Sequence, residues 1–322
     1  MNVIFDGNYL FHKNFSVFST YYKNEDISEV LQDKEKQQVL IRKCVIDFCY
    51  TVRMFKNVDK VIFTIDSSSW RYNLYANYKY SLTKVRDDSY RHFLICLDLF
   101  HKLLNEKGVI VSRVNGAEGD DLMYVWSLVL GYVGDEDNVI VTGDSDIRQL
   151  VNDRVSVMNS NSKQLSLYCV SEREEWLRGQ LNEFMNINTI EPFDIVLYKV
   201  IMGDKSDNIP KLFNGFGEKA FEKFMNFLKP YKEPQNVDLV TMGRWIADAV
   251  CRFMKKREDE VLGQILFNLK MTWLNLSVYE SNDLQTYNGK ELLQNMIDDI
   301  NSKKYKYKGE YTLESFYGML IK

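Results

Sequence analysis

Four short runs rich in valine and isoleucine recur in the first half of the chain, and such runs are typical of buried strands. They cover residues 2–5, 60–65, 109–111 and 138–141. Segments with helical periodicity lie between them, at residues 39–55 and 93–104. Because strands that alternate with helices usually pair in parallel, the pattern predicts an α/β fold, with a mostly parallel, doubly wound sheet flanked by helices.

The sequence from Pro192 onward has a different character. All four prolines lie between residues 192 and 234, and the rest of the chain has helical spacing with few strand signals. Residues 193–202, 241–254 and 290–300 are predicted helices. We therefore predict an α/β domain over residues 1–192 and a smaller helical region over residues 193–322.

The composition is that of a soluble globular protein. The chain has 322 residues and is 45% hydrophobic, which is enough for a large core. Its five cysteines are scattered without a CxxC spacing, as is typical of reduced thiols. The chain opens directly on an apolar strand and lacks a membrane-length apolar run, so we expect no signal peptide, no membrane partner and a cytoplasmic location.

Acidic residues follow the predicted strands. Nine of them form five short clusters, and the first four clusters fall at or soon after the end of an apolar run, where parallel strands deliver their loops to one edge. Gathered carboxylates repel each other and cost several kcal/mol to desolvate, so they require cations. The pattern predicts a site for more than one Mg²⁺ or Mn²⁺ that acts on phosphate. The nine residues are Asp6; Asp66; Glu118, Asp120 and Asp121; Asp144 and Asp146; Asp204 and Asp207.

Single members of this set allow a second interpretation. Asp6 and Asp66, each directly after a strand, could serve only as turn or N-cap residues. Three acids at residues 118–121 precede an apolar helix, and a helix N-terminus gains under ~1 kcal/mol from each acid, so capping would need only one or two of them. The net charge of −4 also disfavours a nucleic-acid partner, but it would be +5 without the nine acids.

Cations and tyrosines alternate between residues 71 and 91. This segment holds five cations and five tyrosines against two acids, which suits a channel that binds phosphates and unpaired bases of a single strand. A solvated helix with an aromatic core face is the alternative. The cations are Arg71, Lys79, Lys84, Arg86 and Arg91.

The order of these motifs resembles that of the flap endonuclease and 5′→3′ exonuclease family, which includes phage-type RNase H enzymes and the nuclease domain of bacterial DNA polymerase I. The matching motifs are the strands that end in Asp6 and Asp66, then residues 118–121, 142–146 and 203–210. The resemblance spans roughly residues 1–225. It implies a PIN-like or Rossmann-like domain with a helical arch around residues 71–92, and a helix-hairpin-helix motif at about residues 203–225.

The same resemblance implies two metal sites. Asp6, Asp66, Glu118 and Asp120 would lie towards the first ion, with Asp144 near both, and Asp121, Asp146, Asp204 and Asp207 would lie towards the second. The ions would be Mg²⁺, for which Mn²⁺ substitutes. No histidine base is required, and His12, His92 and His101 are expected to be structural or surface residues.

Further residues are assigned to the nucleic acid by resemblance. Lys79, Arg71 and Arg86 would stabilise charge during catalysis, while Tyr78 and Lys84 would contact the substrate. Gly215, Gly217 and Lys219 resemble a helix-hairpin-helix turn, which contacts duplex phosphates and binds K⁺ in the family, although a plain turn is the alternative. The preceding residues 211–214 depart from the family's usual run.

We therefore expect a monomeric, metal-dependent, structure-specific 5′ nuclease that cleaves phosphodiester bonds at junctions of single-stranded and duplex nucleic acid. Its substrates would be DNA and RNA/DNA hybrids with a 5′ flap or junction, as in primer removal during replication. A polymerase or single-strand-binding protein would act in trans, in the host cytoplasm if a phage encodes the chain. A non-catalytic junction-binding protein on the same fold and a PIN-type ribonuclease are the alternatives.

Overall fold

The computed structural model describes residues 1–79, 88–168, 171–182, 186–255, 261–281 and 288–303. Lys84 and Arg86, two of the predicted substrate contacts, lie outside these residues. The chain forms two compact units, each discontinuous in sequence. The first comprises residues 1–69, 85–190 and 294–322, and the second comprises residues 70–84 and 191–293.

A seven-stranded sheet forms the centre of the first unit, in the order β3-β2-β1-β4-β5-β6-β7. All neighbouring strands pair in parallel except β5 and β6, so the prediction of a mostly parallel sheet is confirmed. The strands are β1 (Asn2–Asp6), β2 (Lys60–Thr64), β3 (Ile110–Ser112), β4 (Asn138–Thr142), β5 (Val155–Asn159), β6 (Gln164–Leu167) and β7 (Asn186–Thr189).

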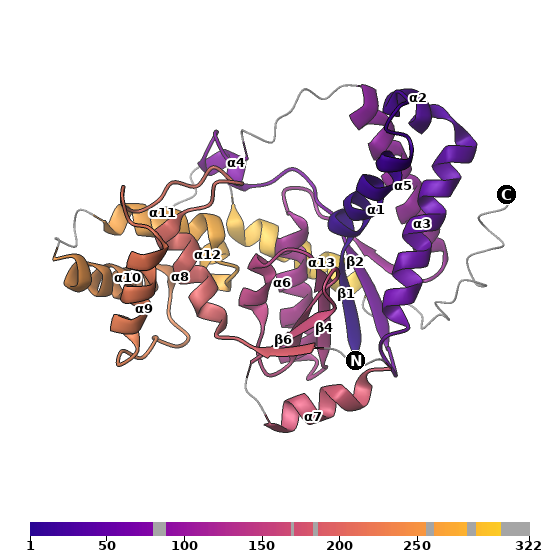
Figure 1. Cartoon of the computed structure of the whole chain (residues 1–322). Coiled ribbons are helices and arrows are strands. Elements are labelled where there is room, and N and C mark those ends of the chain that lie inside the picture. The colour runs from indigo at the N-terminus through magenta and orange to yellow at the C-terminus, as the bar shows by residue number, and fades with distance from the viewer. Residues whose placement is uncertain (80–87, 169–170, 183–185, 256–260, 282–287, 304–322) are drawn as a thin grey trace. The chain divides into compact units, whose positions relative to one another are not determined.

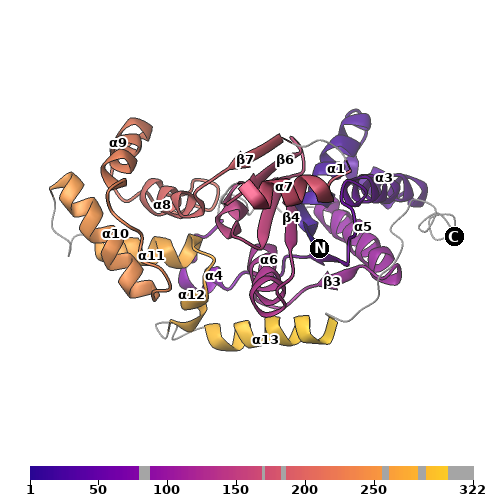
Figure 2. The same cartoon turned by 90° about the horizontal axis from the view of Figure 1, so that it is seen from below.

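Helices cover both faces of the central strands (Figures 1 and 2). Phe5 and Phe63 alternate with Ile4 and Ile62 along paired strands, and all four side chains are fully buried because both faces are covered. The phenylalanines belong to one core cluster with residues of α1, α2, α3, α5 and α7. The helices of this unit are α1 (Gly7–Tyr21), α2 (Ile27–Gln32), α3 (Lys34–Val52), α5 (Asp88–Glu106), α6 (Gly119–Leu128) and α7 (Ser171–Gln180).

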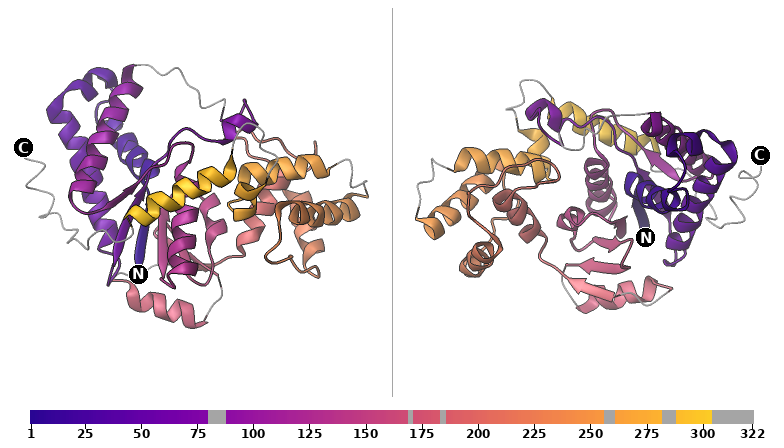
Figure 3. Two further views of the ribbon diagram at one scale, coloured as in Figure 1. Left: turned by 180° about the vertical axis from the view of Figure 1, so that it is seen from behind. Right: turned by 45° about the horizontal axis from the view of Figure 1, so that its top comes forward.

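The helix α13 (Gly289–Lys303) spans the boundary of the two units in sequence and is drawn in yellow in Figure 3. Within the first unit its Asp299 accepts a hydrogen bond from the Ser112 hydroxyl at the end of β3, with an oxygen-to-oxygen distance of 2.6 Å. The C-terminal part of this helix is therefore fixed at the end of β3. No helix of the described residues has the length and apolar character needed to cross a bilayer.

The second unit is built from helices, in which α10 packs on α11 and α11 packs on α8. Its helices are α4 (Arg71–Leu74), α8 (Pro192–Met202), α9 (Glu218–Leu228), α10 (Leu239–Met254), α11 (Leu262–Thr272) and α12 (Leu276–Glu280). Gly203 ends α8 at a φ of +69°, and a Cβ atom there would lie 2.5 Å from the Ile209 carbonyl oxygen. Only glycine fits this turn.

Candidate functional site

Three neighbouring strands place carboxylates at one edge of the sheet. Asp6 is the last residue of β1, whereas Asp66 and Asp144 each come two residues after the end of β2 and β4. The sheet order puts β1 between β2 and β4, and the three strands are parallel. Their carboxyl ends therefore meet at the same edge, as the sequence predicts.

Asp6 lies at the centre of this group and is held by two donors. Its carboxylate accepts the Tyr9 backbone N–H at 2.9 Å, which caps α1, and the Thr142 hydroxyl at 2.7 Å. Burial, with smaller effects of the charges of Asp66 and Asp144, raises the pKa of Asp6 to about 7 against the lowering effect of those hydrogen bonds. Asp6 is therefore the N-cap residue of α1, and its charged form is disfavoured by burial and by the neighbouring carboxylates.

Asp66 connects this edge to the loop before α6. One carboxylate oxygen accepts the Gly119 backbone N–H at 2.6 Å, and the other accepts the Asn8 side-chain amide at 2.5 Å. A Cβ atom at residue 119 would lie 3.0 Å from the first of these oxygens. The glycine thus allows the start of α6 to approach Asp66 closely.

The acids of residues 118–121 take different positions at the start of α6. Glu118 is the N-cap residue, and its backbone N–H donates to the Asp121 carboxylate at 2.9 Å. Asp121 is fully buried, whereas Asp120 is only half-buried. Asp121 has a local structural role in this arrangement, and Asp120 is the more accessible carboxylate.

The turn after β4 brings two further acids to the edge. Asp144 is exposed, and its carboxylate accepts the Asp146 backbone N–H at 2.8 Å, while its own N–H donates to the Thr142 hydroxyl. Gly143 packs under the Tyr9 ring, because a Cβ atom there would lie 1.8 Å from a ring carbon. The ring therefore requires glycine between Thr142 and Asp144.

Two neutral side chains donate to these carboxylates. The Thr142 hydroxyl donates to Asp6 and accepts the Asp144 backbone N–H, and the Asn8 amide donates to Asp66. The Asn8 side-chain oxygen is buried and has no hydrogen-bond partner among the described residues. In the described residues, no group of three or more His, Cys, Asp or Glu side chains is arranged so that it could hold a metal ion.

Two histidines in the described part of the chain have lowered pKa values. Burial lowers the pKa of His101 to about 3, and the ring contacts Phe63 and Phe100 in the core. Desolvation also lowers the pKa of His12, against an opposing effect of Asp66. A neutral core role for His101 agrees with the expectation from sequence.

Asp204 and Asp207 lie in the second unit, in the turn after α8. The Asp204 carboxylate pairs with Lys199 at 2.5 Å and accepts the Ser206 N–H at 2.8 Å. Burial raises the pKa of Asp204, but the hydrogen bonds from Lys199 and Ser206 outweigh it and hold the pKa below its ordinary value. Asp204 also pairs through its backbone with Ile209, so the turn closes on itself.

Two predicted substrate residues contact this turn. Tyr78 is buried, and its hydroxyl donates to the Asp207 carboxylate at 3.4 Å. Lys79 adopts a φ of +49°, its N–H donates to the Asp207 carbonyl, and its ammonium lies 5.0 Å from the centre of the Tyr78 ring. Arg71 is only 3% exposed, and it donates to the Met271 carbonyl and stacks on Trp70.

The loop between α8 and α9 holds the remaining predicted contacts. Gly215 has a φ of +80° with open space around it, and Gly217 is the N-cap residue of α9. Lys219 follows in the first turn of that helix and is exposed. Because Gly217 has no side chain, the first backbone N–H groups of α9 receive no side-chain cap.

Several residues of this geometry were not anticipated from the sequence. Thr142, Asn8 and Lys199 each donate to a predicted carboxylate. Thr142 and Asn8 stand two residues from Asp144 and Asp6 in the same motifs, so proximity along the chain could have indicated them. Lys199 lies five residues before Asp204, across the end of a helix, and gives no such signal.

Comparisons with known proteins agree on one group of relatives. A family model described as the 5′–3′ exonuclease N-terminal resolvase-like domain matches residues 1–177. A protein named 5′–3′ exonuclease from Mycoplasmopsis pulmonis is 23% identical over 98% of this chain and 93% of its own length. A DNA polymerase I from Chloroflexus aurantiacus is 29% identical over 47% of this chain, which is only 15% of the polymerase.

Two solved structures from bacteriophage T5 share the fold. A T5 5′-exonuclease with bound divalent zinc ions covers 92% of this chain and 99% of its own, with a TM-score of 0.52 and 15% identity. A T5 flap endonuclease in a pseudo-enzyme-product complex with DNA and metal ions covers 93% of this chain and 98% of its own, with a TM-score of 0.54 and 14% identity.

Proposed function

Because this chain belongs to the 5′–3′ exonuclease family, we propose that it is a structure-specific 5′ nuclease that hydrolyses phosphodiester bonds with two divalent metal ions. The observation that carries the proposal is the convergence of Asp6, Asp66 and Asp144 at the carboxyl ends of three adjacent parallel strands. Primer and flap removal is the proposed role, with DNA and RNA/DNA hybrids as substrates.

The oxygen donors at the sheet edge suit divalent metal ions chemically, although in the described residues these acids are not grouped closely enough to hold an ion without movement of their side chains. Carboxylate and amide oxygens are the ligands that Mg²⁺ prefers, and here they are supplied by Asp6, Asp66 and Asp144 together with the unpartnered oxygen of Asn8. The charged form of Asp6 is disfavoured by burial and by its acidic neighbours, so a bound cation would stabilise that form. We propose Mg²⁺ as the physiological ion, with Mn²⁺ as a substitute.

The further ligands rest on the family resemblance. Glu118 and Asp120 at the start of α6 would complete the set for the first ion. Asp121, Asp146, Asp204 and Asp207 are proposed for the second, although Asp121 and Asp204 also have the local contacts described above. When bound, paired divalent ions supply positive charge for the scissile phosphate and lower the pKa of water.

The chain's own residues orient this chemistry. Thr142 and the Tyr9 N–H donate to the Asp6 carboxylate, and the Gly119 N–H and Asn8 donate to Asp66, so these donors restrict the orientation of both acids. Lys79, supported by Arg71 and Arg86, is proposed to stabilise negative charge on the phosphate during cleavage. Tyr78 and Lys84 would contact the unpaired strand, and Gly215, Gly217 and Lys219 the duplex, with K⁺ at the same turn.

Cleavage of labelled substrates tests the proposal. The full chain would be incubated with 5′-labelled flap, nicked duplex and RNA/DNA hybrid, with Mg²⁺, with Mn²⁺ and with a chelator. We expect metal-dependent release of short labelled products from at least one substrate. Absence of cleavage under every metal condition, or equal cleavage in chelator, would refute the two-metal mechanism.

The role of Lys79 has its own test. Lys79→Ala should lower single-turnover cleavage by about 10²-fold while duplex affinity changes little, because an electrostatic group acts mainly in the transition state. Lys219→Ala serves as the matched control and should weaken duplex binding with little change in the saturated rate. Equal losses of rate and affinity in Lys79→Ala would assign that lysine to binding alone.

A further inference from the structure

A groove of about 750 Å³ lies in the first unit between α1, α3 and the turn that joins β5 to β6. Helices α1 and α3 pack against each other and lie side by side in Figure 2. None of the nine predicted metal ligands lines the groove, although its Asn161 donates to the hydroxyl of Tyr9, whose ring packs on Gly143 at the sheet edge. None of its lining residues has a role in the proposed nuclease chemistry.

Large apolar side chains along this groove are open to solvent. Val17 of α1 and Val39, Ile46 and Tyr50 of α3 are each 41–52% exposed. The three residues of α3 are spaced by seven and four positions, so they form one stripe along the helix. A continuous stripe of this kind is typical of a surface that packs against another molecule.

Positive charge borders the same stripe. The groove is lined by Lys13, Arg42, Lys43 and Lys163, against a single acid, Asp47. Asp47 pairs with Lys13 at 2.6 Å and accepts the Asn14 amide, so its charge is offset locally. Lys163 lies 5.8 Å from the centre of the Tyr50 ring, at one end of the stripe. The groove is therefore basic on a chain whose net charge is −4.

We propose that this groove binds a short acidic peptide segment of a partner protein, with aliphatic or aromatic side chains between its acids. The apolar stripe would bury those side chains, and Arg42, Lys43 and Lys163 would pair with the acids. Charge complementarity selects an anionic partner. A groove of this size accommodates a few side chains of one segment and not a whole domain face.

The character of the exposed groups favours a peptide over a nucleic acid. Binding of single strands relies on several aromatic faces on which bases stack, but the stripe offers one aromatic ring, Tyr50, and three aliphatic side chains. Valine and isoleucine gain by contact with other apolar side chains, and they provide no stacking surface for bases. The proposal goes beyond the nuclease function, because it concerns a protein partner at a separate surface.

Fluorescence anisotropy with the full chain tests the proposal. The probes are short fluorescein-labelled peptides in which Asp or Glu alternates with Leu, Ile or Phe, and a control set in which Lys replaces each acid. We expect the acidic set to bind and the basic set not to bind. Two double variants, Arg42→Glu with Lys43→Glu and Val39→Ser with Ile46→Ser, should each weaken the acidic set at least ~10-fold.

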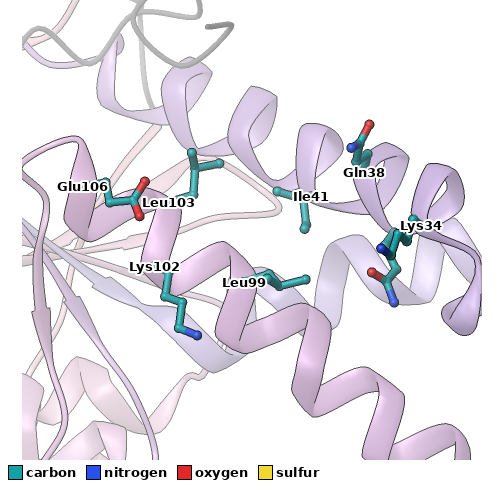
Figure 4. A pocket seen from close by; sticks show the side chains of 8 residues that line it. Lys34, Gln38, Ile41, Leu99, Lys102, Leu103 and Glu106 are labelled. Carbon is teal, nitrogen blue, oxygen red and sulfur yellow. The ribbon is translucent and has the colours of Figure 1, made fainter. Parts of the chain in front are cut away.

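A second pocket on another face of α3 supplies matched controls. It has a volume of about 420 Å³ and lies between α3 and α5, lined among others by Lys34, Leu99 and Lys102 (Figure 4). Lys34→Glu with Lys102→Glu makes the same change of charge as the first double variant, and Leu99→Ser removes an apolar side chain of 40% exposure. These controls should bind the acidic peptides as the wild type does.

Each contrary outcome overturns the proposal. Failure of the whole acidic set to bind, or equal binding by the groove variants and the controls, would remove the peptide site. Weaker binding of a single-stranded oligonucleotide by the groove variants would reassign the groove to nucleic acid, and loss of a dimer in sedimentation would reassign it to a second copy. Flap cleavage should be unchanged in the groove variants, so failure of the nuclease proposal remains a separate result.

Discussion

The sheet edge of the first unit and the turn after α8 in the second unit both present predicted metal ligands. The two regions shift the pKa of their acids in opposite directions. At the edge, burial and the charges of Asp66 and Asp144 raise the pKa of Asp6 to about 7. In the turn, hydrogen bonds from Lys199 and Ser206 lower the pKa of Asp204 against the effect of burial. Neutral donors hold Asp6, whereas a cation of the chain itself, Lys199, pairs with Asp204.

A folded protein can hold a carboxylate with neutral hydrogen-bond donors or with a cation of its own. A carboxylate held by neutral donors, as Asp6 is held by Thr142, should cost little stability when it is replaced, and it favours binding of an external cation. A carboxylate with its own lysine stabilises the fold and gains less from an added ion. Substitutions in the two regions should therefore have opposite profiles.

The largest expected effect is on catalysis at the sheet edge. Asp144→Asn keeps the shape of the side chain and its contact with the Asp146 N–H, but it removes a charge that the metal ions require. Cleavage of a flap substrate in Mg²⁺ should fall by about 10³-fold or more, with little change in the free energy of unfolding. If Asp144→Asn kept its cleavage activity and lost stability, the sheet edge would behave as we expect of the turn after α8.

The converse effect is expected in the turn after α8. Asp204→Asn leaves Lys199 without its carboxylate in a half-buried position, so the free energy of unfolding should fall by about 1–3 kcal/mol. Urea denaturation followed by circular dichroism measures this loss. Lys199→Met, which removes the cation as well, should restore part of the stability when combined with Asp204→Asn. Additive losses in the double variant would contradict a coupled pair.

A smaller effect is expected from the neutral donor at the edge. Thr142→Val removes the hydroxyl that donates to the Asp6 carboxylate and accepts the Asp144 backbone N–H, and cleavage should fall by roughly 10-fold, because the Asp6 carboxylate and the turn that carries Asp144 lose their fixed orientation. Thr142→Ser keeps the hydroxyl and should retain most of the activity. If both variants cleaved as the wild type does, the hydroxyl would have no part in orienting the acids.

The smallest effect concerns Glu233, an acid of the second unit that has no cation in its described surroundings. Burial raises its pKa to about 7, with further effects of Asp194 and Glu191. A raised pKa stabilises the fold below pH 4.5, and this contribution is lost as the pH rises towards about 7. Glu233→Gln should match the wild type at pH 4.5 and exceed its unfolding free energy at pH 8, by at most about 1 kcal/mol because solvent screens the group. A difference that stays constant with pH would exclude this titration.

Much of the fold could be predicted from local pattern. The four apolar runs became β1 to β4, and the predicted helices at residues 39–55, 93–104 and 241–254 correspond to α3, α5 and α10. Strands β5, β6 and β7 were not predicted. Strand β5 closely follows a turn, and β6 and β7 are short and half polar. These segments form strands because they pair with neighbouring strands, and not because of a strand-like pattern in their own sequences.

The sequence by itself determined that carboxylates would gather at one sheet edge, because strand periodicity and position within each motif are local properties. Only the tertiary structure decided what each carboxylate contacts: Asp66 meets Gly119 and Asn8, Asp6 meets Thr142, and Asp204 meets Lys199. Partners such as Thr142 and Asp6 are far apart in the chain and meet only when neighbouring strands pair. Whether a carboxylate is repelled by its neighbours or neutralised by a cation depends on those contacts. The positions of the acids in the sequence therefore could not reveal it.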